Sequence, residues 1–218
     1  MGTNSVLRVF QHDSDDEPFN IDVSSDNHTA VAATNDFFVV GGEDGFATKY
    51  SLISNSMEEV LVRSSLPVRD IAISPDGEWV AVASDELEVK VVNAKDTARV
   101  MFLREQSRPV KHVSFDVSGT IVAASCTDGM VYLYSLSMEQ PQLIKRIDGL
   151  IKTLETDAEA SAKVAWHPDG RAFGVSTTTR GIHPLRLVDL ERYASLDGIV
   201  CARQAAEEKA DDVQISRS

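Results

Sequence analysis

The sequence is short of cysteine, of basic residues and of long apolar runs. Its two cysteines, Cys126 and Cys201, lie far apart, which excludes a disulfide framework and favours a reducing, intracellular compartment. No run of about eighteen apolar residues occurs, and the N-terminal MGTNSVLRVF lacks a basic segment followed by an apolar one, so we expect neither a membrane span nor a secretory signal. With 21 basic against 34 acidic side chains, the net charge is −13. That charge argues against a protein that binds a nucleic-acid backbone with its whole surface.

An internal repeat is the dominant feature of what is present. Hydrophobic residues make up 43% of the 218 residues, enough for a folded core. The stretch Val68–Asn93 aligns with Val110–Ser135, so that Gly77 and Gly119 are 42 positions apart. The same interval separates three acidic residues that precede a glycine or a leucine, which are Asp44, Glu86 and Asp128. A fourth unit, AKVAWHPDGRAFGVSTTT, follows after a longer loop.

Each unit is predicted to contain short strands joined by tight turns. Apolar, β-branched and aromatic residues alternate along Val68–Ile73 and Trp79–Val82, which is typical of half-buried strands. Ser74–Gly77 and His167–Gly170 share a proline, an aspartate and a glycine in the order that a β-turn favours. Asp44-Gly45 and Asp128-Gly129 predict two-residue hairpin turns for the same reason. The chain is therefore expected to be mostly antiparallel sheet.

Repeats of about 40 to 45 residues with four strands each are typical of the blades of a WD40-type β-propeller. The segment Val6–Phe10 is predicted to be the third strand of a blade whose first half is missing. A seven-bladed ring would need roughly 290 residues. We therefore predict an all-β, incomplete WD40-type propeller of about four blades over residues 1–180, an open arc that is unstable unless another subunit caps it.

The C-terminal segment departs from the repeat. After the strand predicted at Ala172–Thr177, a third strand is expected near residue 180, but Pro184 interrupts any strand there. We predict that residues 181–211 are an irregular or partly helical insertion, and two origins stay open, a genuine insertion or a gene-model artefact. Alternation returns at Val213–Ser216, so residues 212–218 are predicted to be a displaced strand of the last blade.

The order of several stretches resembles one family of chromosome proteins. These stretches are LRVF, an acidic loop with Glu-Pro, DELEVKVVNAKDT, RPVKHVSFDVSGTIVAASCTDGMVYLYS and KVAWHPDG, and together they cover roughly residues 5–180. They resemble the N-terminal propeller of the acidic nucleoplasmic DNA-binding protein family, also called WD-repeat and HMG-box DNA-binding protein, with the fungal minichromosome-loss and chromosome transmission fidelity proteins. Two pairs common in WD40 blades, Gly-His and Trp-Asp, are absent, so the usual Asp-His-Ser network is not expected.

The resemblance implies a nuclear, non-enzymatic scaffold of the replication fork. In that family the scaffold links the replicative helicase to DNA polymerase alpha and supports sister chromatid cohesion, DNA repair and the mitotic cell cycle. The family's hub work is largely done by a second, C-terminal propeller and a trimerising region, so neither trimer formation nor direct polymerase coupling is expected of the present sequence. Two alternatives stay open: a WD40 adaptor of vesicle trafficking or translation, and a propeller hydrolase with a metal in its channel.

A local basic rim is the one candidate binding site. Arg69, Lys111 and Lys163 each follow the first apolar residue of a unit, and Arg108 lies just upstream of Lys111. Propeller symmetry would place the first three at equivalent points of one rim, where they could bind an acidic peptide, chromatin or DNA. The competing interpretation is that they are solvated side chains at exposed strand starts.

No residue pattern supports catalysis, a metal or a cofactor. The acidic loop His12–Pro18 lacks the spaced oxygen ligands and glycine of a calcium loop. Gly41–Gly45 lacks the lysine and the following helix of a phosphate-binding loop and is interpreted as a hairpin turn. The five histidines are scattered, and none has a partner at ligand spacing.

Overall fold

Five separate antiparallel sheets make up the computed structural model, which describes residues 5–10, 17, 19–23, 27–136, 140–147, 161–168, 172–178 and 185–189. Within these ranges every regular element is a strand, and no helix there is long and apolar enough to cross a membrane. The strands are β1 (Ser5–Val9), β2 (Phe19–Val23), β3 (His28–Ala33), β4 (Phe37–Gly42), β5 (Phe46–Ser51), β6 (Ser56–Arg63), β7 (Val68–Ile73), β8 (Trp79–Ser84), β9 (Val89–Asn93), β10 (Val100–Leu103), β11 (Val110–Phe115), β12 (Ile121–Cys126), β13 (Val131–Ser135), β14 (Gln142–Ile147), β15 (Ser161–Trp166), β16 (Ala172–Thr178) and β17 (Leu185–Asp189).

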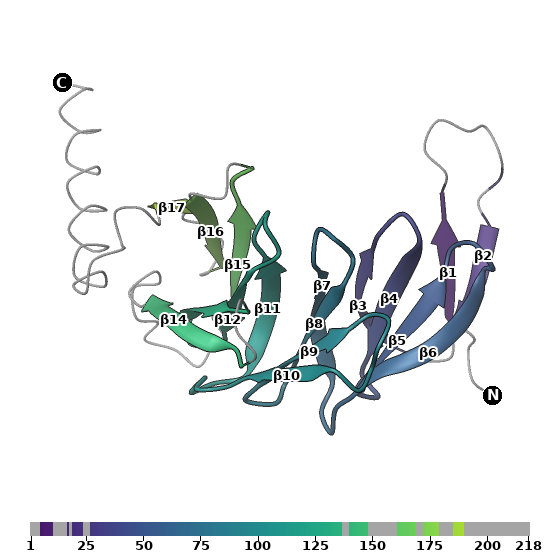
Figure 1. Ribbon diagram of the computed structural model, residues 1–218, viewed down its shortest axis with the longest axis horizontal. Helices are drawn as coiled ribbons and strands as arrows, with labels where there is room; N and C mark the ends of the chain where they lie inside the picture. Colours follow the sequence, from purple (N-terminus) through teal and green to yellow (C-terminus); the bar gives the residue numbers. More distant parts are fainter. Residues whose placement is uncertain are drawn as a thin grey trace.

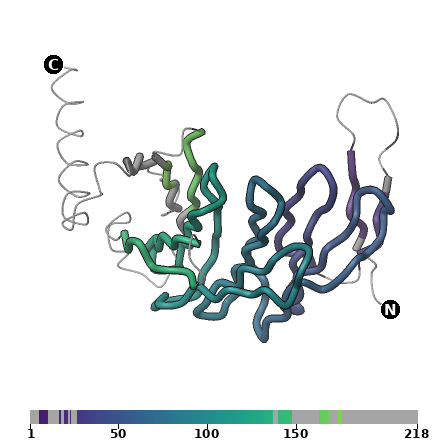
Figure 2. The backbone as a smooth tube through the Cα atoms, viewed as in Figure 1, coloured from purple at the N-terminus to yellow at the C-terminus, as the bar shows by residue number. Residues whose placement is uncertain are grey.

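Each sheet follows chain order, so that neighbours in sequence are neighbours in space. The three complete blades are β3 to β6, β7 to β10 and β11 to β14, flanked by the two-stranded sheet β1–β2 and the three-stranded sheet β15 to β17. The first strands β3, β7, β11 and β15 contact one another in turn, and Figure 1 shows the outer strands β6, β10 and β14 along the opposite side. The tube in Figure 2 follows the same open row, with β1–β2 at one end. The predicted all-β, incomplete WD40-type propeller is confirmed.

Four hydrophobic clusters lie between consecutive sheets and hold the row together. Val80 and Val82 of β8 pack toward the preceding blade, whereas Ala81 and Ala83 of the same strand pack toward the next one. The same pattern joins β1–β2 to the first complete blade and the third complete blade to β15 and β16. Because β8 is buried on both faces, its sequence WVAVAS is almost continuously apolar.

Turn chemistry sets the ends of the strands as predicted. In the Ser74–Gly77 turn the amide of Gly77 donates to the Ser74 carbonyl at 2.8 Å, and Gly77 has a φ of +72°. The hairpin loops differ from the prediction, because both are longer than two residues: Glu43, Asp44 and Gly45 lie between the strands of the first, and Thr127 to Met130 between those of the second. Gly45 has a φ of +82° and its amide donates to the Gly42 carbonyl at 3.1 Å, the arrangement of a type I turn closed by a glycine bulge.

The prediction of an irregular segment over residues 181–211 needs a correction at residues 185–189, which the structure describes. β17 starts at Leu185, directly after Pro184, and pairs antiparallel with β16. The third strand of this blade therefore lies after Pro184 in the sequence, so the proline does not interrupt it. The prediction of an irregular segment was wrong for residues 185–189; residues 190–211 and the predicted displaced strand at 212–218 lie outside the described residues.

Candidate interaction surface

Two of the predicted basic residues meet on one carboxylate. Arg69, at the start of β7, donates through Nε to Asp85 Oδ2 at 2.8 Å, with a second contact through Nη2. Lys111, at the start of β11 in the next blade, donates through Nζ to Asp85 Oδ1 at 3.1 Å. Asp85 follows β8 directly and lies in the loop before β9. The three side chains are 18–32% exposed, so this ionic contact is partly shielded from water.

The contact fixes the charge of Asp85. The hydrogen bond from Arg69 is the main cause that holds the pKa of the Asp85 carboxyl below its ordinary value, burial opposes the shift, and Lys111 adds to it. Asp85 stays ionised near neutral pH, and its negative charge offsets part of the positive charge that Arg69 and Lys111 would otherwise give to the rim. Arg69 and Lys111 therefore join two blades, and their positive charge is shared with Asp85.

Lys163 lies one position away from the place that symmetry predicted. In β15, Val164 pairs with Val175. The equivalent pairs in the two preceding blades are Ile71 with Val82 and Val113 with Ala124. Lys163, one residue before Val164, is therefore equivalent to Asp70 and His112. Arg69 and Lys111 sit at β-bulges, between Val68 and Asp70 and between Val110 and His112, while the β15 ladder is regular. The prediction that Lys163 is their equivalent was therefore wrong, and Lys163 is an exposed residue of the regular ladder.

Further contacts repeat at the same end of the first strands. His112 Nδ1 lies 3.4 Å from Asp70 Oδ2, and the same oxygen accepts the Val113 amide at 3.0 Å. At the preceding boundary the Thr29 hydroxyl donates to the Val68 carbonyl at 2.6 Å. Polar side chains thus join neighbouring first strands at two successive boundaries.

Arg108 lies in the loop that leads from β10 to β11 and is exposed. The neighbouring Ser107 fixes this loop on the next blade, because its hydroxyl lies 3.2 Å from the Tyr132 hydroxyl and 3.2 Å from Asp128 Oδ2. Tyr134 also donates to the Arg104 carbonyl. Arg108 is therefore an exposed cation on an anchored loop, next to the first residues of β11.

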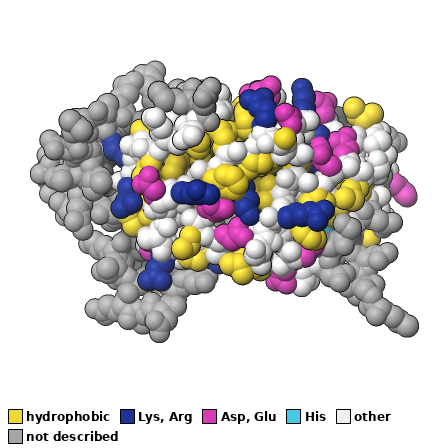
Figure 3. All heavy atoms as spheres, turned by 60° about the horizontal axis from the view of Figure 1, so that its bottom comes forward, with side chains coloured by type: hydrophobic (Ala, Val, Ile, Leu, Met, Phe, Trp, Pro, Cys, Tyr) yellow, Lys and Arg dark blue, Asp and Glu magenta, His cyan; other side chains and the backbone are white. Residues whose placement is uncertain are grey.

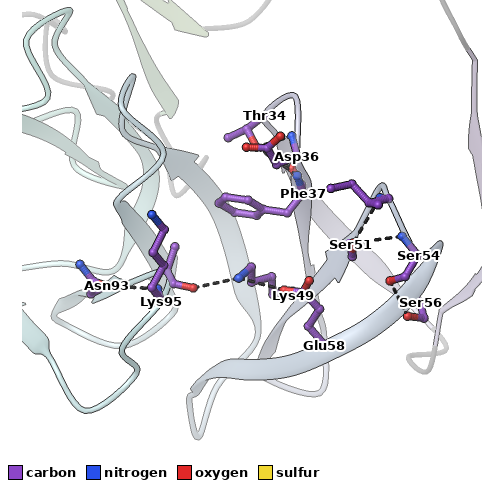
Figure 4. A network of polar contacts seen from close by, with 12 residues as sticks. Thr34, Asp36, Phe37, Lys49, Ser51, Ser54, Ser56, Glu58, Asn93 and Lys95 are labelled. Atoms are coloured by element: carbon purple, nitrogen blue, oxygen red, sulfur yellow. Dashed lines mark hydrogen bonds and ion pairs between the residues drawn. The ribbon is translucent and has the colours of Figure 1, made fainter.

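Another polar contact between blades could not be predicted from the sequence. Figure 4 shows Lys49 of β5 between Glu58 of its own blade and the loop after β9 of the next blade. Lys49 Nζ lies 2.9 Å from Glu58 Oε2 and donates to the Ala94 carbonyl at 2.9 Å, and it lies 4.9 Å from the centre of the Phe37 ring. The Lys49 side chain is 12% exposed. Nothing in the alternation of β5 distinguishes it from a solvated lysine.

Metal-binding groups are not assembled in the part of the chain that the structure covers. No group of three or more histidine, cysteine, aspartate or glutamate side chains there could hold a metal ion. Cys126 is fully buried in the cluster between two blades, and burial raises the pKa of its thiol to about 12. A thiol with that pKa is a packing residue, since the thiolate is the reactive form.

The fold and its inter-blade contacts define a WD40-type propeller module. The model of the WDHD1 first WD40 domain matches residues 1–197, so the chain belongs to that family. This is the family that the sequence was predicted to resemble, so that prediction is confirmed.

Three relatives agree with this assignment. Minichromosome loss protein 1 of Schizosaccharomyces pombe is 38% identical over 178 residues, which cover 82% of this chain and 22% of that protein. WD repeat and HMG-box DNA-binding protein 1 of Xenopus laevis is 22% identical over 84% of this chain and 16% of its own length. DNA polymerase alpha-binding protein of Saccharomyces cerevisiae is 25% identical over 69% of this chain and 16% of its own length. The chain thus spans about a fifth or less of these relatives.

A solved structure shares the fold. The β-propeller domain of Cps50 (Swd1) from Myceliophteria thermophila superimposes with a TM-score of 0.63 at 18% identity, covering 76% of this chain and 52% of that domain. At this identity the likeness concerns the propeller fold alone.

Proposed function

We propose that this chain is a non-enzymatic protein-interaction module of a nuclear replisome scaffold. The observation that carries the proposal is the match of residues 1–197 to the first WD40 domain of the family. One relative is named for binding DNA polymerase alpha, and another for minichromosome loss. The partners proposed for this module are therefore proteins of the replication fork, in assemblies that contain DNA polymerase alpha and the replicative helicase and that act in chromatid cohesion and DNA repair.

Blade packing supports a rigid interaction module. Successive sheets are joined by buried hydrophobic clusters and by ionic contacts such as that of Asp85 with Lys111. A framework of this kind keeps exposed loops in fixed positions, which lowers the entropy lost when a partner binds. Family membership favours this function over the vesicle-trafficking, translation and hydrolase alternatives.

Arg108 and Lys163 are the proposed binding residues of the rim. Both are exposed, whereas Arg69 and Lys111 are engaged by Asp85. Arg69 and Lys111 contribute to the rim by holding neighbouring blades in place. The positive charges of Arg108 and Lys163 can therefore be reversed by mutation without breaking the ionic contact of Asp85 with Arg69 and Lys111.

Co-purification from nuclear extract tests the function. The full chain carrying an affinity tag is expected to retain DNA polymerase alpha or the replicative helicase on immunoblots, and a fluorescent fusion is expected to be nuclear. The double variant Arg108→Glu/Lys163→Glu is expected to retain less of the partner. Lys95→Glu, which reverses an exposed lysine in the loop between β9 and β10, is the matched control. Retention of neither fork protein, or an exclusively cytoplasmic fusion, would overturn the proposal.

A further inference from the structure

Two exposed arginines recur at the outer strands of adjacent blades, each beside an aromatic ring. Arg63 ends β6, and its guanidinium carbon lies 5.4 Å from the centre of the Phe46 ring. Arg104 directly follows β10 and lies 5.2 Å from the centre of the Phe102 ring. An arginine held over a ring keeps its planar fork ordered, so less entropy is lost when it binds a carboxylate.

Exposed apolar side chains accompany these arginines. Leu66 is 44% exposed, Leu87 is 55% exposed, and Phe46 and Phe102 are 39% and 41% exposed. In Figure 3, where the outer side of the row comes forward, hydrophobic side chains lie among basic and acidic ones. Aromatic side chains and arginine are enriched at protein interfaces, and exposed leucines beside them add apolar surface that a partner can bury.

Hydrogen bonds hold the parts of this surface together across a blade boundary. The Ser65 amide donates to Glu86 Oε1 at 2.8 Å, which brings the loop of Leu66 against the hairpin loop of Leu87. Lys90 donates to the Arg63 carbonyl at 3.2 Å, and Lys90 pairs with Phe102 across β9 and β10. The backbone of Arg63 and the backbone of Phe102 are therefore linked through Lys90, which holds the two sides of this surface in fixed positions.

Two neighbouring carboxylates, Glu86 and Glu88, already have partners. Glu86 is paired with Lys90 at 2.8 Å, and Glu88 Oε2 accepts from Nε of Arg104 at 3.1 Å. The contact of Arg104 uses Nε, and its side chain remains 69% exposed. Nη1 and Nη2 of Arg104 make no hydrogen bond with the residues that the structure describes. These atoms are the donors that a carboxylate of a partner would take.

The distribution of charge favours a peptide over a nucleic acid. A nucleic-acid backbone is a continuous polyanion that requires a continuous basic face, whereas this surface presents two separate arginines, Arg63 and Arg104. Separate arginines with apolar side chains between them fit a segment in which carboxylates and apolar side chains alternate. We propose that Phe46, Arg63, Leu66, Leu87, Phe102 and Arg104 form a docking surface for an extended acidic and apolar segment of a partner protein. This proposal does not depend on which pathway the partner belongs to.

Fluorescence anisotropy with a short labelled peptide that alternates aspartate and leucine tests the surface on the full chain. We expect saturable binding, weakened about tenfold by Arg63→Glu/Arg104→Glu and by Leu66→Ser/Leu87→Ser. Arg99→Glu is the matched control, because Arg99 is also exposed and lies 5.1 Å from the centre of the Trp79 ring, outside this surface. A peptide that alternates asparagine and leucine is expected to bind weakly.

Several outcomes would overturn the proposal. They are no binding of the aspartate and leucine peptide to the wild-type chain, an equal loss in Arg99→Glu, or displacement of the peptide by single-stranded DNA. Thermal melting of each variant identifies loss of folding, and the exposure of the altered side chains predicts unchanged melting. Because the probe is synthetic, failure here leaves the co-purification of fork proteins unaffected, and the reverse also holds.

Discussion

Lys111 of β11 reaches across the boundary between two blades and lies 3.1 Å from the carboxylate of Asp85, which Arg69 of β7 already contacts. One carboxylate therefore joins a cation of its own blade to a cation of the next. Blades of this kind are stabilised mainly by their neighbours, and Asp85 supplies a polar part of that stabilisation.

Asp85→Asn keeps the size of the side chain but removes its negative charge. We expect the free energy of unfolding to fall by about 1–3 kcal/mol, because Arg69 and Lys111 would then lie close together without a counter-ion. Denaturant titration measures the change. Asp36→Asn, which alters an exposed carboxylate, is expected to have little effect, and an equal loss in both variants would contradict the role of Asp85.

Acid should weaken the same contact. The pKa of the Asp85 carboxyl is lowered in the folded state from an ordinary value of 3.8, mainly by Arg69. A lowered pKa contributes stability that is present above the unfolded-state value and is lost as pH falls through the folded-state value. The stability difference between the wild type and Asp85→Asn is therefore expected to shrink below about pH 4. A difference that stays constant to low pH would show that the charge of Asp85 is unimportant.

Lys49→Met removes the ammonium group shown in Figure 4 and keeps most of the aliphatic chain. The buried Ala94 carbonyl loses its 2.9 Å donor and Glu58 loses its partner. We expect a loss of about 1–3 kcal/mol in the free energy of unfolding. Lys95→Met is the control, since Lys95 is exposed in the neighbouring loop. Similar melting temperatures for the two variants would count against an inter-blade role of Lys49.

Gly45→Ala and Gly77→Ala separate backbone strain from steric overlap. Both glycines have positive φ, but a Cβ at Gly45 would lie 2.3 Å from the Ser64 carbonyl oxygen, while at Gly77 the nearest atoms are 3.9 Å away. We expect a cost of about 1 kcal/mol for Gly77→Ala and about 3 kcal/mol for Gly45→Ala. Thermal and denaturant melts compare the pair, and a larger loss for Gly77→Ala would refute the predicted order.

Cys126 should resist thiol reagents while the protein is folded. Its thiol is buried, and that burial raises its pKa to about 12. In a Cys201→Ser background, which isolates this cysteine, mass spectrometry is expected to find no alkylation by iodoacetamide at neutral pH and full alkylation in denaturant. Rapid alkylation of the folded protein would mean that the boundary between the two blades opens.

Local sequence patterns predicted the blades but not all of their registers. Alternation and turn residues placed the strands around Gly77 and Gly119, where both glycines have positive φ. The position of Lys163 was predicted from the start of the strand, whereas bulges shift Arg69 and Lys111 by one residue and β15 has none. A bulge depends on how two strands twist and pair, which single-strand alternation does not record.

The sequence by itself determined the period of 42 residues and the all-β fold, because turn chemistry and apolar alternation act over a few neighbouring residues. It also determined the family, through the order of its stretches along the chain. Only the tertiary structure decided that Arg69 and Lys111 share Asp85 and that Lys49 bridges two blades. Those contacts join residues from separate strands, and their geometry depends on how whole sheets pack. The basic rim that the sequence predicted is therefore partly a structural joint, with Arg108 and Lys163 as its exposed cations.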